Sequence, residues 1–136
     1  MRSSRAGQRG WKGEYEKALK DYDEVIALNP KSVKGLYNRA WLRATCPEVK
    51  FRDGAKAVQD AKKAHEQPGE KLPQHLEILA TAHAEAGDYT EAVKWQKKAL
   101  EDAAYTKTNG ESASARLKLY EAKKPFRELP REMPMP

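Results

Sequence analysis

The strongest constraint on this chain is an internal repeat with helical periodicity. The segment GEYEKALKDYDEVIALNP at residues 13–30 recurs as GDYTEAVKWQKKALEDA at residues 87–103. A third, weaker copy begins at Gly54. The apolar or small residues of each copy recur at spacings of three and four, which places them on one face of an α-helix. The stripes are Tyr15, Ala18, Leu19, Tyr22, Val25 and Ile26, then Gly54, Ala57, Val58, Ala61, Ala64 and His65, then Tyr89, Ala92, Val93, Gln96, Ala99 and Leu100. Three helices are therefore predicted to share one packing template.

Another helical stretch precedes each of the two later copies, GLYNRAWLRAT before the middle one and PQHLEILATAHAEAG before the last. Ser32 is a plausible N-cap for the first stretch, and the second begins after Pro73, where a missing amide proton is harmless. Gly87 can adopt the left-handed conformation that ends a helix. Ala40 and Ala80 occupy the same place in both stretches, where small side chains allow close helix packing. The predicted unit is helix A, a turn and helix B.

These matches make the chain resemble the tetratricopeptide repeat family, whose unit is a pair of antiparallel helices about 34 residues long. The residues that carry the resemblance are Gly13, Tyr15, Ala18, Tyr22 and Pro30, then Ala80, Gly87, Tyr89, Ala92 and Ala99. The stretch ATCPEVKFRDGAKAV, with the later KPFRE, is similar to a variant in bacterial multi-repeat proteins of this family. The resemblance implies an all-α fold, a right-handed stack of helical hairpins, in which the first repeat is incomplete.

Three segments are expected along the chain. Residues 1–12 are basic and contain two glycines, so they are expected to be disordered or frayed. Residues 13–122 are expected to form the helical repeat domain, and residues 123–136, rich in proline, an extended tail.

Two places depart from a regular repeat. Gly110 is expected to break the chain before a C-terminal capping helix near residues 111–122, because a stack of repeats needs a terminal helix with a polar outer side. The turn at residues 46–53 is longer than the family pattern by about five residues, and Arg52 stands where a turn glycine is expected.

The charge pattern argues against nucleic acid as a partner. The formal net charge is +6, but the excess lies at the two ends, and the acidic and basic side chains of residues 13–122 balance. No element carries a basic stripe interleaved with aromatic residues. No apolar run reaches the length of a membrane span or of a signal peptide, so a cytoplasmic protein without a membrane partner is expected.

The residue pattern gives no support to catalysis or metal binding. Cys46 has no base beside it in the sequence, as a nucleophile would need. His75 and His83 lie about two helical turns apart, too far to bind one ion without further ligands, and His65 ends a packing stripe. We therefore predict no catalytic residue, no metal and no cofactor, and expect a protein that is not an enzyme.

The resemblance implies instead a groove for a partner peptide or helix, formed by successive A helices of a scaffold or adaptor module. The predicted groove residues are Lys34, Tyr37, Asn38, Trp41, Gln74, Glu77, Ile78, Thr81 and Glu85. Some members of the family clamp the terminal carboxylate of a chaperone, but only Asn38 matches that set of residues. Capture of a terminal carboxylate is therefore disfavoured.

One alternative stays open at this point. In this alternative, the chain is a structural fragment of a larger repeat protein, and its exposed first helix packs on missing chain or on a second copy. A weak homodimer is the partner that this alternative predicts, because an uncovered apolar helix face favours self-association.

Overall fold

The computed structural model describes residues 4–128, and it describes side chains from residue 14 onward. The helices are α1 (Ser4–Leu28), α2 (Val33–Thr45), α3 (Gly54–Glu66), α4 (Pro73–Glu85), α5 (Tyr89–Leu100) and α6 (Ala103–Glu121), with a short 3₁₀ turn, η1 (Val49–Phe51). Residues 4–128 contain no β-strand. The predicted all-α stack is confirmed. In this part of the chain no helix is both long and apolar enough to cross a membrane.

The helix ends follow from local capping chemistry. The Ser32 hydroxyl accepts a hydrogen bond from the Gly35 amide at 3.1 Å, and Pro73 stands at the start of α4. Gly87 has a φ of 90°, in the left-handed region that favours glycine. These three sequence predictions are confirmed.

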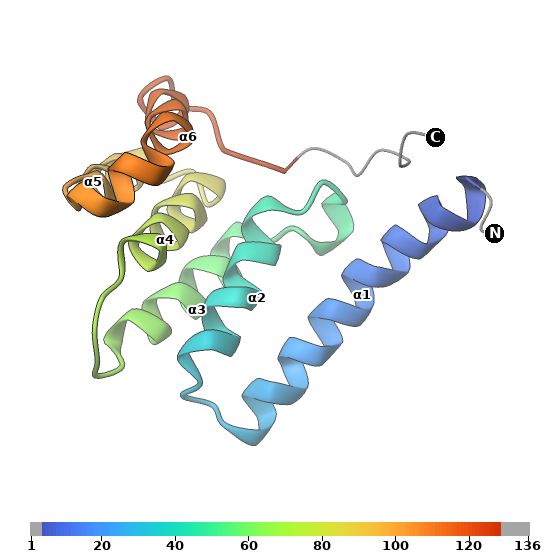
Figure 1. Cartoon of the computed structure of the whole chain (residues 1–136). Coiled ribbons are helices and arrows are strands. Elements are labelled where there is room, and N and C mark those ends of the chain that lie inside the picture. Colours follow the sequence, from blue (N-terminus) through green and yellow to red (C-terminus); the bar gives the residue numbers. More distant parts are fainter. Residues whose placement is uncertain (1–3, 129–136) are drawn as a thin grey trace.

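The helices alternate between two roles in the stack (Figure 1). The A helices are α2, α4 and α6, and the B helices are α1, α3 and α5. Helix α4 packs against α5, its partner in the same hairpin, and against α2 and α3, the two helices of the preceding hairpin. This arrangement brings the three A helices together on one side, where they form a shared surface.

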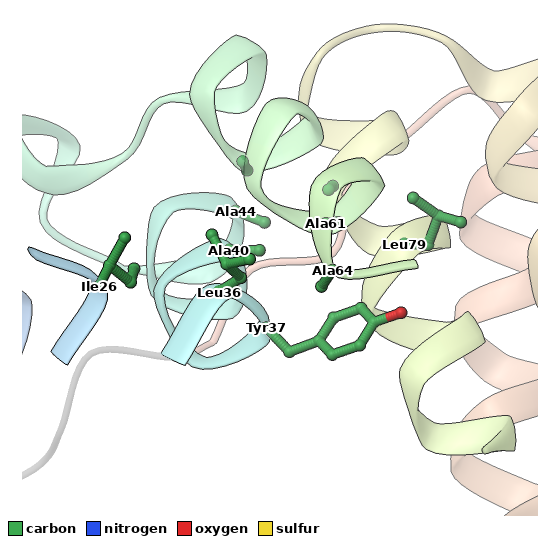
Figure 2. Packing of buried hydrophobic residues seen from close by; sticks show 10 residues of the cluster. Ile26, Leu36, Tyr37, Ala40, Ala44, Ala61, Ala64 and Leu79 are labelled. Carbon is green, nitrogen blue, oxygen red and sulfur yellow. The ribbon is translucent and has the colours of Figure 1, made fainter. Parts of the chain in front are cut away.

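Small side chains form much of the core. Ala40 and Ala80, the pair predicted to permit close packing, are both 0% exposed. Figure 2 shows Ala40, Ala44, Ala61 and Ala64 with Leu36 and Leu79 in the cluster that joins α2, α3 and α4. An alanine buried at a helix crossing lets two backbones approach closely, so the stack depends on these positions keeping small side chains.

Two predicted boundaries are wrong. Helix α1 begins at Ser4, so residues 4–12 are helical rather than frayed, and residues 1–3 lie outside the described part of the chain. Helix α6 runs unbroken through Gly110 from Ala103. A glycine inside a helix costs only about 1 kcal/mol relative to alanine, which neighbouring helix-forming residues offset.

In the long turn at residues 46–53, Arg52 stands at the position where a glycine was expected, and side-chain contacts stabilise the turn. Arg52 has a φ of −88°, which any residue adopts, so no glycine is needed there. Its Nη1 donates to the Cys46 carbonyl oxygen at 2.8 Å, and the Asp53 side chain caps α3 by accepting from the Lys56 amide. Arg52 thus stabilises the turn, and Asp53 begins the next helix.

Substitution of Gly54 tests how closely this turn brings α3 to α4. A Cβ atom at Gly54 would lie 2.6 Å from the backbone nitrogen of Ala86 and 2.6 Å from the carbonyl carbon of Glu85. Backbone atoms cannot give way as a flexible side chain does, so we expect Gly54→Ala to lower the free energy of unfolding by about 1–3 kcal/mol. Urea unfolding followed by circular dichroism measures this.

Gly110→Ala is the matched control. A Cβ atom there would meet only the Thr106 side chain, at 3.0 Å from its methyl carbon. The higher helix propensity of alanine, about 1 kcal/mol, should offset that contact and leave stability equal or higher. Equal effects of the two substitutions would contradict the close approach of α3 to α4.

Candidate functional site

Two hollows lie on the A-helix face, the surface that Asn38, Trp41, Gln74, Ile78 and Arg116 form on α2, α4 and α6. The first hollow, of about 420 Å³, lies between α1, α2 and α4. The second, of about 430 Å³, lies between α2, α4 and α6. Trp41 and Ile78 line both hollows and therefore form the ridge between them.

The first hollow combines aromatic and polar groups. Tyr15 and Tyr22 line its α1 side, and Asn38, Thr45 and Cys46 line its α2 side. The second hollow is lined from α4 by Gln74 and Glu77 and from α6 by Tyr105, Asn109, Ser112 and Arg116. Aromatic rings beside amide groups suit an extended peptide, which needs both apolar contact and hydrogen bonds to its backbone.

Five predicted groove residues line these hollows, namely Asn38, Trp41, Gln74, Glu77 and Ile78. Of these, Glu77 is only 7% exposed. Lys34 is exposed in the first turn of α2 and lines neither hollow. Tyr37 and Thr81 are buried, and Glu85 lies at the end of α4, where it pairs with two arginines.

The expectation that Tyr37 flanks the groove is wrong. Its ring stacks on His75 with 4.4 Å between ring centroids, and Figure 2 shows it extending from α2 toward the residues Ala64 and Leu79. Burial raises the pKa of Tyr37 to about 12. Burial, and then the charge of Lys71, lower the pKa of His75. Tyr37 thus packs α2 against α4.

Thr81 and Glu77 belong to a buried polar layer that fixes α6 to α4. The Thr81 hydroxyl lies 2.9 Å from the Tyr120 hydroxyl oxygen and donates or accepts there. Glu77 Oε1 accepts from the Tyr105 hydroxyl at 2.5 Å, and Oε2 accepts from Gln96 Nε2 at 3.1 Å. Arg116 Nη1 lies 2.6 Å from the same Oε2. Burial, and then the Glu77 carboxylate, raise the pKa of Tyr105, which keeps its hydroxyl protonated as the donor.

This layer sets the far wall of the second hollow. Because Arg116 is held by Glu77, its guanidinium lies beside the ridge residue Trp41, with its Cζ atom 5.6 Å from the ring centroid. The carbon Cζ of Arg116 also lies 4.4 Å from the ring centroid of Phe126. A cation beside two aromatic rings is attracted to both, and these contacts orient the rings.

The contacts of the segment that follows α6 were not predicted from the sequence. Lys123 has a φ of 61°, and the Lys123 and Lys124 amides donate to the Tyr120 and Leu119 carbonyl oxygens, which ends α6 in a Schellman turn. This turn directs the chain back over the A-helix face, where Phe126 lies 6.0 Å from Trp41 between ring centroids. Phe126 and Arg127 of KPFRE were the sequence signal for this contact, because a tail that only faces solvent needs neither an aromatic ring nor an arginine.

The histidines and the cysteine have packing roles. The ring centroids of His65 and Trp95 lie 5.1 Å apart in an edge-to-face arrangement. Burial is the main cause that lowers the pKa values of His65 and His83. Cys46 is buried, and burial raises the pKa of its thiol, which disfavours the reactive thiolate. Among the described residues, no three His, Cys, Asp or Glu side chains are grouped to hold a metal ion.

One family model matches the chain. Residues 74–110 match the model described as tetratricopeptide repeat, and they include most of α4, all of α5 and the start of α6. Neither the curated proteins nor the solved structures give a match. The hairpin of α4 and α5 is therefore the repeat that carries the family sequence pattern, and the likeness of the residue 46–53 turn to bacterial proteins stays a prediction.

Removal of the Glu77 carboxylate tests the buried polar layer. Glu77→Ala leaves Arg116, Tyr105 and Gln96 without their shared acceptor, and breaking a buried ion pair in this way costs about 3–5 kcal/mol. We expect a loss near the lower end of that range, because Arg116 keeps partial contact with solvent. Urea unfolding measures the change.

Glu111→Ala, at an exposed position of α6, is the control and should change the free energy of unfolding by less than about 0.5 kcal/mol. Glu77 would have no structural role if both variants unfolded at the same urea concentration.

Proposed function

We propose that this chain, whose residues 74–110 match the tetratricopeptide repeat model, is a non-catalytic scaffold or adaptor module whose A-helix face binds a segment of a partner protein. Repeats of this family are in general protein–protein interaction modules. The observation that supports the finer proposal is the pair of hollows on either side of Trp41 and Ile78. They lie on consecutive A helices, and one extended segment could follow both.

The side chains that line the hollows suit a polypeptide ligand. Asn38 and Gln74 carry amide groups that no hydrogen bond among the described residues uses, and each amide both donates and accepts. These groups match the alternating donors and acceptors of a peptide backbone. Trp41 supplies apolar area at the ridge, and tryptophan is enriched among the residues that dominate binding energy.

The rigid helices favour binding because they hold the face in place before the partner arrives. The partner then loses most of the conformational entropy, and the module loses little. The face is modest in area and mixed in charge, so we expect dissociation constants near micromolar, about 8 kcal/mol of binding free energy.

Amide removal at the two hollows tests this proposal. The double variant Asn38→Ala with Gln74→Ala should reduce capture of partner proteins from a lysate of the source cells at least tenfold, because each hollow loses its polar contact to the partner backbone. Quantitative mass spectrometry of the captured proteins measures the loss. Circular dichroism should show an unchanged helical signal.

Lys97→Ala, at an exposed position of the B helix α5, is the matched control and should leave capture intact. Equal loss in both variants, or no loss in the double variant, would place binding away from the A-helix face.

Self-association through α1 is the second candidate. Leu28 is 89% exposed and Val25 is 44% exposed on α1, a helix that packs mainly against α2. Two large apolar side chains one turn apart offer a small contact for a second copy.

Sedimentation at rising concentration tests the second candidate. We expect a weak dimer, and Leu28→Glu should abolish it because burying the new carboxylate in the dimer contact would cost more than the contact gains. A monomer at all concentrations in the unsubstituted chain would exclude this role for α1.

A further inference from the structure

Residues 125–128 lie across the A-helix face as an extended segment. The segment leaves α6, pairs with the end of α4, and reaches α2 (Figure 1). Its last main-chain contact is a hydrogen bond from the Glu128 amide to the Thr45 carbonyl oxygen at 2.9 Å. The chain therefore already places a short peptide across the three A helices.

Each side chain of the segment after Pro125 has a chemically matched partner. Phe126 lies beside both the Trp41 ring and the Arg116 guanidinium. Arg127 donates from Nε and Nη2 to the two oxygens of Glu85, at 3.0 and 3.1 Å, the paired geometry that favours arginine over lysine. The Trp41 Nε1 donates to Glu128 Oε2 at 3.1 Å. An aromatic ring, an arginine and an acid are thus each recognised in order.

The same order of side chains occurs a second time in the chain and meets the same carboxylate. Phe51, Arg52 and Asp53 form the end of the long turn, and Arg52 Nε lies 3.4 Å from Glu85 Oε2. Phe51 packs near an aromatic ring, Tyr15, as Phe126 packs near Trp41. Two segments of one chemistry therefore converge on Glu85, which argues that the Glu85 carboxylate selects arginine.

We infer that Trp41, Glu85, Arg116 and the Thr45 carbonyl form a recognition site for an extended aromatic–arginine–acid segment, and that residues 125–128 are its intramolecular occupant. A partner segment of the same chemistry binds by displacing this occupant. The inference rests on the proposed function, since it names the ligand chemistry for the same face.

The occupant is suited to displacement. It is short, has no helical hydrogen bonds, and Arg127 remains 45% exposed on the side chain while Glu85 is 11% exposed. The tether is short and keeps the segment at an effective concentration on the order of millimolar, so a partner segment must bind more tightly than the occupant to displace it.

Fluorescence anisotropy with a labelled peptide tests the site in the full chain. The peptide is Lys-Pro-Phe-Arg-Glu, the sequence of residues 124–128. We expect it to bind the full-length variant Phe126→Ala with Arg127→Ala at least tenfold more tightly than the unsubstituted chain, because the variant cannot fill its own site. Circular dichroism establishes that both proteins are equally helical.

Peptide variants provide the matched controls, since they leave the protein unchanged. Peptides carrying Phe126→Ala or Arg127→Glu should bind the double variant at least tenfold more weakly than the original peptide. If the double variant is less helical, Arg127→Glu alone, at an exposed position, replaces it as the protein with a weakened occupant.

Absence of peptide binding to a helical variant overturns the inference, and so does equal binding of the charge-reversed peptide. The outcome is distinguishable from that of the wider proposal. Capture that depends on Asn38 and Gln74 without peptide binding refutes this inference alone, whereas peptide binding with capture indifferent to those amides refutes the wider proposal alone.

Discussion

The close approach of helix backbones is the constraint on which the rest of this structure depends. Eleven of the nineteen buried apolar residues in the described part of the chain are alanines. Because alanine fills little volume, the stack gains stability by bringing helices near one another rather than by burying large side chains. Gly54 extends the same constraint to the backbone of Glu85 and Ala86, where even a methyl group finds no space. The A-helix face is a consequence, since hairpins packed this closely keep α2, α4 and α6 side by side.

The C-terminal end of α4 connects this packing to the candidate site. Gly54 contacts α4 at the backbone of Glu85. The Glu85 carboxylate forms ion pairs with Arg52 of the long turn and with Arg127 of the C-terminal segment. A carboxylate beside the last carbonyl groups of a helix is disfavoured by the helix dipole, and two guanidinium groups offset that cost. The turn at residues 46–53 thus brings Arg52 to Glu85 and places Asp53 as the cap of α3.

Local chemistry made most of the helices predictable from the sequence. Ser32, Pro73 and Gly87 act within one turn of their own positions, so their roles do not depend on the rest of the fold. The helical period also predicted which faces are buried. It could not separate Tyr37 from Asn38 or Thr81 from Ile78, because neighbouring positions at the border of a face differ only in how the next A helix crosses. That crossing is set by the alanine contacts between helices, and a single sequence does not state it.

The polar contacts were beyond local reasoning for a different reason. In the sequence, Glu77 does not differ from a surface carboxylate, and its partners Tyr105, Gln96 and Arg116 lie on two other helices. Phe126 does not differ from a residue of a solvated tail, and only the turn after α6 places it near Trp41. Both cases depend on contacts between residues far apart in the chain. They are also linked, since the Glu77 carboxylate holds the Arg116 guanidinium that packs on Phe126. The buried layer that holds α6 against α4 therefore also shapes the surface on which the C-terminal segment lies, because one arginine belongs to both.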